Sequence, residues 1–294
     1  LEGREQTLAV ARIQGNIEQG LKWNPAFQQT TVDLYRDLSR AAGGERKLDL
    51  IIWPESATPF YFQDAGPLAH TVGQVPPDTG ALLLFGSPAY EPSGPDFRYL
   101  NSAFLLSAEG GMLGRSDKVH LVPFGEYVPF GRWFPFIDKL VVGIGDFSPG
   151  TITPLPMNGH QAGVLVCFEG IFPELAREHV RKGADLLVNI TNDAWFGHSS
   201  APWQHLAMTR FRAVENRIWV ARAANTGITA FITPAGRITA QTPLFETASL
   251  VDTVGLGAAP TLYGRLGDLI PAIFLGLTLI GIFWLRRGRR ERHG

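Results

Sequence analysis

An uncharged apolar segment near the C-terminal end limits the architectures open to this chain. Residues 269–285 read LIPAIFLGLTLIGIFWL and contain no charge. A helix of this length rises about 26 Å, close to the hydrocarbon thickness of a bilayer. Five arginines follow within residues 286–292, and such a basic flank stays in the cytoplasm. We therefore predict a transmembrane helix over 266–285, a cytoplasmic tail over 286–294, and a preceding domain on the extracytoplasmic face of a bacterial inner membrane.

The alternative for this segment is a buried core helix followed by a basic tail. A core helix of this length normally carries a polar stripe, and the only polar side chain here that could form one is Thr278. At the other end the chain starts with Leu1, and no signal-peptide pattern follows. We expect the natural chain to be longer, with further residues upstream.

The remainder, residues 1–262, reads as one α/β domain. Short apolar or alternating runs predict buried strands, and apolar residues at helical spacing predict helices. Strands are expected at 7–14, 48–53, 81–88, 101–108, 161–168 and 185–192, and in the runs VARAAN, TAFITP and GRITAQ between 220 and 241. Helices are expected at 26–42 (ending at Gly43-Gly44), at 172–182 and between 203 and 218. Residues 109–160 show little regular pattern and predict long functional loops.

Composition excludes several function classes. A net charge of −1 with 45% hydrophobic residues is typical of neither a disordered chain nor a nucleic-acid-binding protein. The single cysteine, Cys167, excludes an internal disulfide and a cysteine metal cluster. The histidines show no ligand spacing, so we expect no metal and no organic cofactor.

Three reactive side chains follow buried apolar runs. Glu55 comes after LIIWP, Lys118 precedes VHLVPFGE, and Cys167 ends GVLVC. A carboxylate can take the proton of a thiol, the thiolate can attack a carbonyl, and an ammonium can stabilise the resulting oxyanion. The N–H of Phe168 offers a second oxyanion donor. Taken singly, the three have ordinary explanations: a surface charge, a loop charge and core filling.

The set of Trp53-Pro54-Glu55, Lys118 and Cys167-Phe168-Glu169 resembles the nitrilase, or carbon–nitrogen hydrolase, superfamily. Within it, several strings resemble the apolipoprotein N-acyltransferase family. They are residues 14–17 (QGNI), 21–23 (LKW), 118–129 (KVHLVPFGEYVP), 192–197 (NDAWFG) and 222–227 (RAANTG). The resemblance runs from about residue 7 to the terminal apolar segment.

This resemblance implies a four-layer α-β-β-α sandwich followed by one transmembrane helix. It also implies several transmembrane helices upstream, which this chain lacks. The catalytic roles carried over are Glu55 as general base, Lys118 as oxyanion stabiliser and Cys167 as nucleophile. A departure is Phe168, where the superfamily commonly has Tyr; a role of the backbone N–H survives this change, whereas a hydroxyl role does not.

Further residues match positions that the resemblance ties to the site. Glu126 is expected to support the three catalytic residues near Lys118. Trp23 and Glu169 match positions tied to substrate handling or site integrity. Trp195 and Trp203 are weaker candidates for a lipid-facing entrance, and packing in the core explains them equally well.

The implied reaction moves a fatty acyl chain from a phospholipid, through a cysteine thioester, to the N-terminal amine of an S-diacylglyceryl-cysteine lipoprotein. The aromatic loop 124–136 is then a candidate lid or membrane-dipping element, although it can equally be a loop packed on the core. Two alternatives stay open. One is a membrane-tethered amidase or nitrilase that hydrolyses a small C–N substrate, and the other is a non-catalytic module that binds lipid or lipoprotein.

Overall fold

The computed structural model describes residues 6–127 and 147–291, with the side chains of 285, 286 and 288–291 outside the described set. The chain divides into two compact units, Leu1–Ala259 and Pro260–Gly294. Each unit is described by itself. The candidate lid at 124–136 falls largely outside the described residues, which include only its first four positions.

Unit 1 contains two six-stranded sheets, ordered β12-β1-β2-β3-β4-β5 and β11-β10-β9-β8-β7-β6. In the first, β1, β2 and β3 run parallel, and in the second β7, β8 and β9 do. The first sheet is formed by β1 (Thr7–Gln14), β2 (Leu50–Ile52), β3 (Leu82–Ser93), β4 (Asp96–Leu106), β5 (Met112–Asp117) and β12 (Ala248–Gly255). The second is formed by β6 (Leu155–Met157), β7 (His160–Val166), β8 (Leu186–Thr191), β9 (Val220–Ala224), β10 (Ala230–Ile232) and β11 (Ile238–Gln241).

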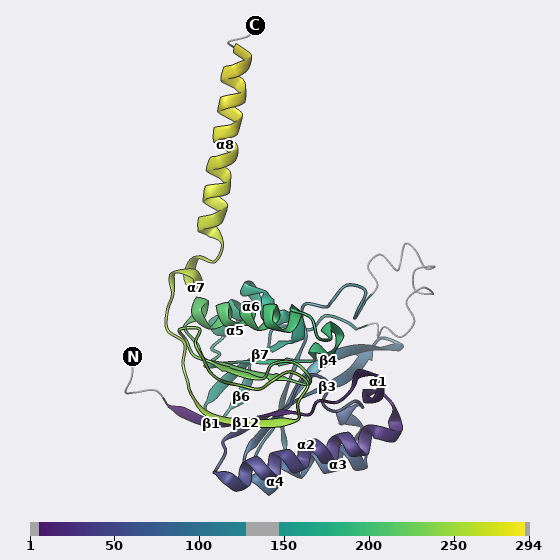
Figure 1. The fold of residues 1–294 in the computed structure, drawn as a ribbon. Coiled ribbons are helices and arrows are strands. Elements are labelled where there is room, and N and C mark those ends of the chain that lie inside the picture. Colours follow the sequence, from purple (N-terminus) through teal and green to yellow (C-terminus); the bar gives the residue numbers. More distant parts are fainter. Residues whose placement is uncertain (1–5, 128–146, 292–294) are drawn as a thin grey trace. The chain divides into compact units, whose positions relative to one another are not determined.

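The two sheets face each other, and helices cover their outer faces (Figure 1). Against the first sheet lie α2 (Pro25–Glu45), α3 (Pro67–Gly73) and α4 (Val75–Thr79), with α1 (Gln19–Lys22) before them. Against the second lie α5 (Pro173–Arg181) and α6 (Ala201–Asn216). Three short 3₁₀ turns complete unit 1: η1 (Phe62–Asp64), η2 (Cys167–Ile171) and η3 (Asp193–Phe196). The expected α-β-β-α sandwich is confirmed.

Burial explains why the central strands form where they do. Every residue of β2, β8 and β9 is buried, because both faces of these strands are covered. One apolar cluster fills the space between the sheets and draws on both of them, including Leu50, Leu105, Val166 and Ile190. Continuous apolar runs in the sequence are the expected signature of strands covered on both faces.

Several sequence expectations need correction. The helix α2 continues over Gly43 and Gly44 to Glu45 and does not stop at the glycine pair. The strand expected over 161–168 ends at Val166, because Cys167 takes a positive φ of 54° and starts a 3₁₀ turn. The region 109–160 contains β5 and β6, which were not predicted, and β12 was also not predicted.

A buried arginine without a hydrogen-bonding partner lies between the sheets. Arg12 on β1 is fully buried, and its three guanidinium nitrogens make no hydrogen bond with any described residue. Its guanidinium carbon lies 2.9 Å from the centre of the Phe231 ring. Burial lowers the pKa of Arg12 well below its ordinary value, against the attraction of Asp252. The cation–ring contact is therefore the main compensation for removing this charge from water.

We expect Arg12→Met to raise the free energy of unfolding by about 1–3 kcal/mol, because an apolar chain of similar length removes a poorly paired buried charge. Urea unfolding at pH 7 measures the change. The exposed Arg46→Met is the control and is expected to change stability by less than about 0.5 kcal/mol. A loss of stability in Arg12→Met would mean that the contact with Phe231 outweighs the cost of burial.

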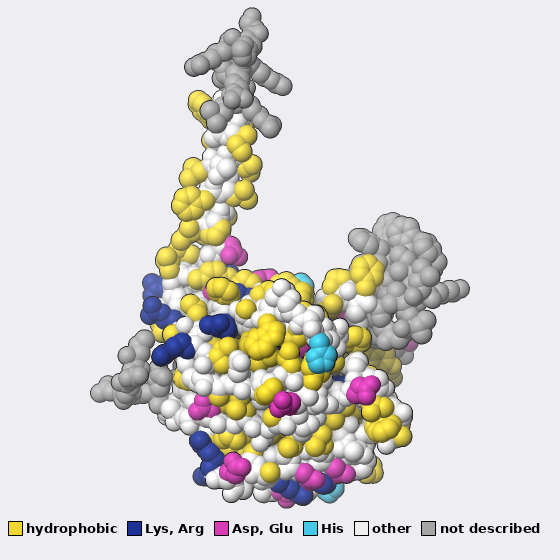
Figure 2. Space-filling model, viewed as in Figure 1, with side chains coloured by type: hydrophobic (Ala, Val, Ile, Leu, Met, Phe, Trp, Pro, Cys, Tyr) yellow, Lys and Arg dark blue, Asp and Glu magenta, His cyan; other side chains and the backbone are white. Residues whose placement is uncertain are grey.

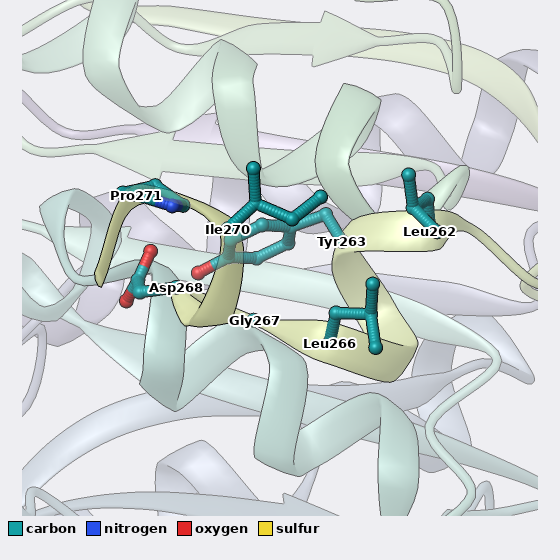
Figure 3. Close-up of a pocket in the computed structure, with 7 residues that line it drawn as sticks. All are labelled: Leu262, Tyr263, Leu266, Gly267, Asp268, Ile270 and Pro271. Carbon is teal, nitrogen blue, oxygen red and sulfur yellow. The ribbon is translucent and has the colours of Figure 1, made fainter. Parts of the chain in front are cut away.

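Unit 2 consists of α7 (Leu262–Leu266) and α8 (Leu269–Glu291). A pocket of about 350 Å³ lies at the junction of the two helices, lined by Leu262, Tyr263, Leu266, Gly267, Asp268, Ile270 and Pro271 (Figure 3). Large apolar side chains of α8 are exposed along its described length (Figure 2). Within the residues that the structure describes, no helix combines the length and the hydropathy that a membrane crossing requires.

Candidate active site

Glu55 lies in the turn that follows β2 and is 8% exposed. Its Oε1 accepts a hydrogen bond from Asn101 Nδ2 (2.8 Å), and its Oε2 accepts one from the backbone N–H of Asn192 (3.0 Å). Gly86 on β3 passes directly beneath this turn. A Cβ at Gly86 would lie 2.6 Å from Glu55 Cα, so only glycine leaves the turn room. Both carboxylate oxygens are thus held by donors from other strands.

Lys118 follows β5 and is 1% exposed. Its ammonium contacts both carboxylate oxygens of Glu126, at 2.9 and 2.8 Å, and lies 3.8 Å from Glu55 Oε1. Burial works against the charged form, but the negative charges of Glu55 and Glu126 outweigh it and raise the pKa of Lys118. A permanent cation therefore lies between two carboxylates.

Asn101 on β4 joins the two carboxylates. Its Nδ2 donates to Oε1 of Glu55 and to Oε1 of Glu126, both at 2.8 Å. Glu126 is further fixed by the N–H of Val122, which donates to Oε2 (2.9 Å). The expectation that Glu126 lies beside Lys118 agrees with this geometry, and Asn101 adds a link that the sequence analysis did not include.

Cys167 occupies the first position after β7, in a left-handed backbone conformation that non-glycine residues rarely adopt. The carboxyl ends of the parallel strands β2, β7 and β8 are where Glu55, Cys167 and Asn192 follow, which is a common placement of reactive groups in α/β sheets. Such a strained turn held by its surroundings is typical of functional sites. It presents the thiol, in a partly exposed residue, at the strand ends.

Glu169 ties the Lys118 segment to the Cys167 turn. Its buried Oε1 accepts from the N–H groups of Val119 (2.7 Å) and His120 (2.9 Å), and its Oε2 accepts from the N–H of Val166 (2.7 Å). Burial raises the pKa of Glu169, and the three backbone donors oppose that rise. Its carboxylate therefore holds together the segments that carry two of the three reactive residues.

The thiol is not ionised in the resting site. Burial, together with the negative charge of Glu55, raises the pKa of Cys167 to about 12, while the positive charge of Lys118 opposes the rise. A thiol of this kind attacks only if a base takes its proton in the same step. The arrangement consequently needs a nearby carboxylate, and Glu55 is the one whose charge Cys167 feels most strongly.

A second buried network supports the Cys167 turn from below. The carbonyl oxygen of Cys167 accepts from Asn189 Nδ2 (3.2 Å) and lies 3.1 Å from His205 Nε2. Because a carbonyl only accepts, that nitrogen of His205 carries a proton. Asp193 contacts His205 Nδ1 at 3.0 Å and forms an ion pair with Arg222 at 2.6 Å, with all three side chains buried.

The aromatic candidates are exposed. Trp23, Trp195 and Trp203 are 48%, 75% and 49% exposed, so packing in the core does not explain them. Phe168 is partly buried and makes an edge contact with Phe172, with ring centres 5.4 Å apart. Its side chain carries no polar group, so only its backbone N–H can serve the reaction.

Two site residues stood in the quoted motifs without being chosen. Lys22 precedes Trp23, and its buried ammonium donates to the backbone oxygen of Glu55 (2.9 Å). Asp193 follows Asn192 and is fully engaged with Arg222 and His205. Their signal was a charge inside an otherwise apolar setting. Among the described residues, no group of three His, Cys, Asp or Glu side chains is arranged to hold a metal ion.

Comparison with known proteins matches residues 9–259 to the carbon–nitrogen hydrolase family. A protein from Geobacter metallireducens named apolipoprotein N-acyltransferase is 54% identical over 95% of this chain and 54% of its own length. A Methylococcus capsulatus protein of the same name is 39% identical over 96% of this chain and 55% of its own length. The chain thus spans about half the length of these curated relatives.

Solved structures share the fold. An amidase from Nesterenkonia sp. has a TM-score of 0.64 at 23% identity, covering 92% of this chain and 97% of its own. Saccharomyces cerevisiae Nit3, of the nitrilase superfamily, has a TM-score of 0.65 at 18% identity, covering 85% of this chain and 90% of its own. At these identities the likeness concerns the fold alone.

Proposed function

Because this chain belongs to the carbon–nitrogen hydrolase family, we propose that it is the catalytic part of an apolipoprotein N-acyltransferase that works through a thioester on Cys167. The observation that carries the proposal is the meeting of Glu55, Lys118 and Cys167 at the strand ends, in a chain 54% identical to a relative of that name. The acyl donor is a phospholipid, and the acceptor is the free N-terminal amine of an S-diacylglyceryl-cysteine lipoprotein.

In the first half-reaction, the sulfur of Cys167 attacks the ester carbonyl carbon while Glu55 takes the thiol proton. The carbonyl oxygen becomes an oxyanion, which Lys118 and the N–H of Phe168 stabilise. The C–O bond then breaks, and the leaving alkoxide takes the proton back from Glu55. The products are a lysophospholipid and an acyl thioester on Cys167.

In the second half-reaction, the amine of the acceptor attacks the thioester carbonyl and gives a proton to Glu55. The C–S bond breaks as the oxyanion collapses, and the thiolate of Cys167 recovers that proton. The product is an amide on the lipoprotein N-terminus. Water must be kept from the thioester during the exchange, since hydrolysis would release a free fatty acid.

The proposal includes attachment to a membrane. The exposed apolar side chains of α8 and the uncharged sequence 269–285 support a terminal anchor. The arginines after it favour a cytoplasmic C-terminus and a catalytic unit on the periplasmic side. Holding both lipid substrates in one bilayer raises their effective concentration at the site. Exposed Trp23, Trp195 and Trp203 are proposed to contact lipid.

The test is the intact mass of the full-length protein in detergent after incubation with phosphatidylethanolamine, beside Cys167→Ala. We expect a fatty-acyl increase in the wild type that hydroxylamine removes and that the variant lacks. No adduct with lipid, combined with turnover of small amides, would overturn the proposal in favour of an amidase. No adduct with either would favour a binding module.

A further inference from the structure

We propose that Lys22 is a second cation of the catalytic centre, which stabilises the Cys167 thiolate and positions Glu55 through its backbone carbonyl. The inference rests on the proposed function only in taking Cys167 as the reacting group. Lys22 lies far from Lys118 in the sequence, and it reaches the centre from α1 on the opposite side of Glu55 in the chain's order of strands.

The burial of Lys22 is the first observation. The residue is 2% exposed, although it sits at the end of a four-residue helix beside the exposed Trp23. Its one hydrogen bond goes to the backbone oxygen of Glu55, at 2.9 Å. A lysine with its ammonium buried is uncommon unless charge partners compensate for lost hydration. The charges that attract this ammonium are Glu55 and Cys167, the groups that exchange the proton in the proposed reaction.

The segment that carries Lys22 is fixed to the centre at a second point. Gln19 Oε1 accepts from Asn192 Nδ2 (2.7 Å), and the backbone N–H of Asn192 donates to Glu55 Oε2 (3.0 Å). Residues 19 and 22 therefore hold the Glu55 turn from both its carboxylate and its carbonyl sides. These contacts fix the position of the ammonium and explain why α1, short as it is, forms where it does.

The charge balance gives Lys22 its effect. Glu55 and Glu126 contribute two negative charges near Lys118, and Lys118 supplies one positive charge shared between them. Asp193 and Arg222 balance each other in the network below Cys167. A thiolate on Cys167 would add a further negative charge. Lys22 is the buried cation left to offset it, with an effect on the thiol smaller than those of Glu55, Lys118 and Asp193.

Lys22 loses its charge within an accessible pH range. Burial lowers its pKa from 10.5 to about 8, against the attraction of Glu55 and Cys167. The ammonium is therefore present below pH 8 and is lost as the pH rises through that value. Lys118, whose pKa is raised, stays charged over the same range. The support that Lys22 gives to the thiolate should disappear near pH 8.

The experiment is the rate of alkylation of Cys167 by iodoacetamide between pH 6.5 and 9.5, on the full-length protein in detergent, followed by intact mass. Cys167 is the only cysteine of the sequence, so the mass reports this thiol alone. The variants are Lys22→Met and Lys22→Arg, with the exposed Lys47→Met as matched control. The wild-type rate should rise with pH but flatten near pH 8, by roughly three- to tenfold relative to a simple thiol titration.

Lys22→Met should alkylate roughly three- to tenfold more slowly than wild type at pH 7 and should match it at pH 9.5. Lys22→Arg should keep the low-pH rate and lose the flattening, because arginine stays charged. Lys47→Met should follow the wild type throughout. A loss of rate in Lys22→Met that is the same at every pH would indicate a structural role only and would overturn the proposal.

The wild-type profile needs no variant to fold, and a profile without flattening would also overturn the inference. Alkylation uses neither lipid nor lipoprotein. A protein that shows the flattening and yet gains no acyl mass from phosphatidylethanolamine would support Lys22 as a second cation while contradicting the acyltransferase proposal. The two failures are therefore distinguishable.

Discussion

Lys118→Met is expected to slow the formation of the Cys167 thioester by about 10³-fold, because the buried ammonium is the strongest electrostatic donor available to the oxyanion. The same change leaves Glu55 and Glu126 facing each other with their shared cation removed. It should therefore also lower the free energy of unfolding by about 3–5 kcal/mol. Single-turnover acylation followed by intact mass measures the first effect, and urea unfolding at pH 7 measures the second.

A double variant separates these two effects. In Lys118→Met with Glu126→Gln, one excess negative charge is gone, so most of the lost stability should return. The acylation rate should stay low, since the oxyanion still lacks its cation. Recovery of the rate to within about tenfold of wild type would mean that Lys118 serves only to neutralise Glu126.

Arg222→Met is expected to lower the free energy of unfolding by about 3–5 kcal/mol at pH 7, because it leaves the Asp193 carboxylate buried and unpaired beneath the Cys167 turn. In the wild type, burial would raise the pKa of Asp193, but Arg222 and His205 outweigh burial and lower it from 3.8 to about 2. The stabilisation from this pair is thus complete above pH 3.8 and is lost as the pH falls toward 2.

The deficit of Arg222→Met should therefore shrink as the pH is lowered from 7 to 3, since the unpaired carboxyl of the variant can take up a proton and the wild type gains nothing in return. Urea unfolding at several pH values measures this. Arg181→Met is the matched control: its partner Glu178 lies 3.8 Å away on the surface, so we expect a change below about 0.5 kcal/mol. An equal deficit for Arg222→Met at pH 7 and pH 3 would contradict the assignment.

The sequence was most informative where burial and chemistry coincide. Apolar runs predicted β2, β7 and β8 because both faces of these strands are covered, and the reactive residues follow two of them. The strand that was expected to include Cys167 ended earlier, because the positive φ at this position depends on contacts with Asn189, His205 and Glu169, all from other segments. A propensity argument contains no information about such contacts.

The partners of the catalytic residues were harder to predict for the same reason. Asn101 lies in an ordinary strand pattern, and only the pairing of β3 with β4 brings its amide to Glu55 and Glu126. Lys22 was quoted as part of a motif, yet its burial follows from the fold around α1. In both cases the residue type was visible in the sequence, whereas its distance from Glu55 was set by tertiary structure.

The pairing of β1 with β12 has a consequence for how the catalytic unit is tethered. The two strands run antiparallel, with Thr7 opposite Gly255, so the chain enters and leaves the sandwich at neighbouring points on one edge. Chain segments attached before Thr7 and after Gly255 would pull on the same corner of the first sheet. Tension in these tethers would therefore be carried locally by the β1–β12 ladder, and the ends of β2 and β7, where the reactive groups lie, would be spared the strain.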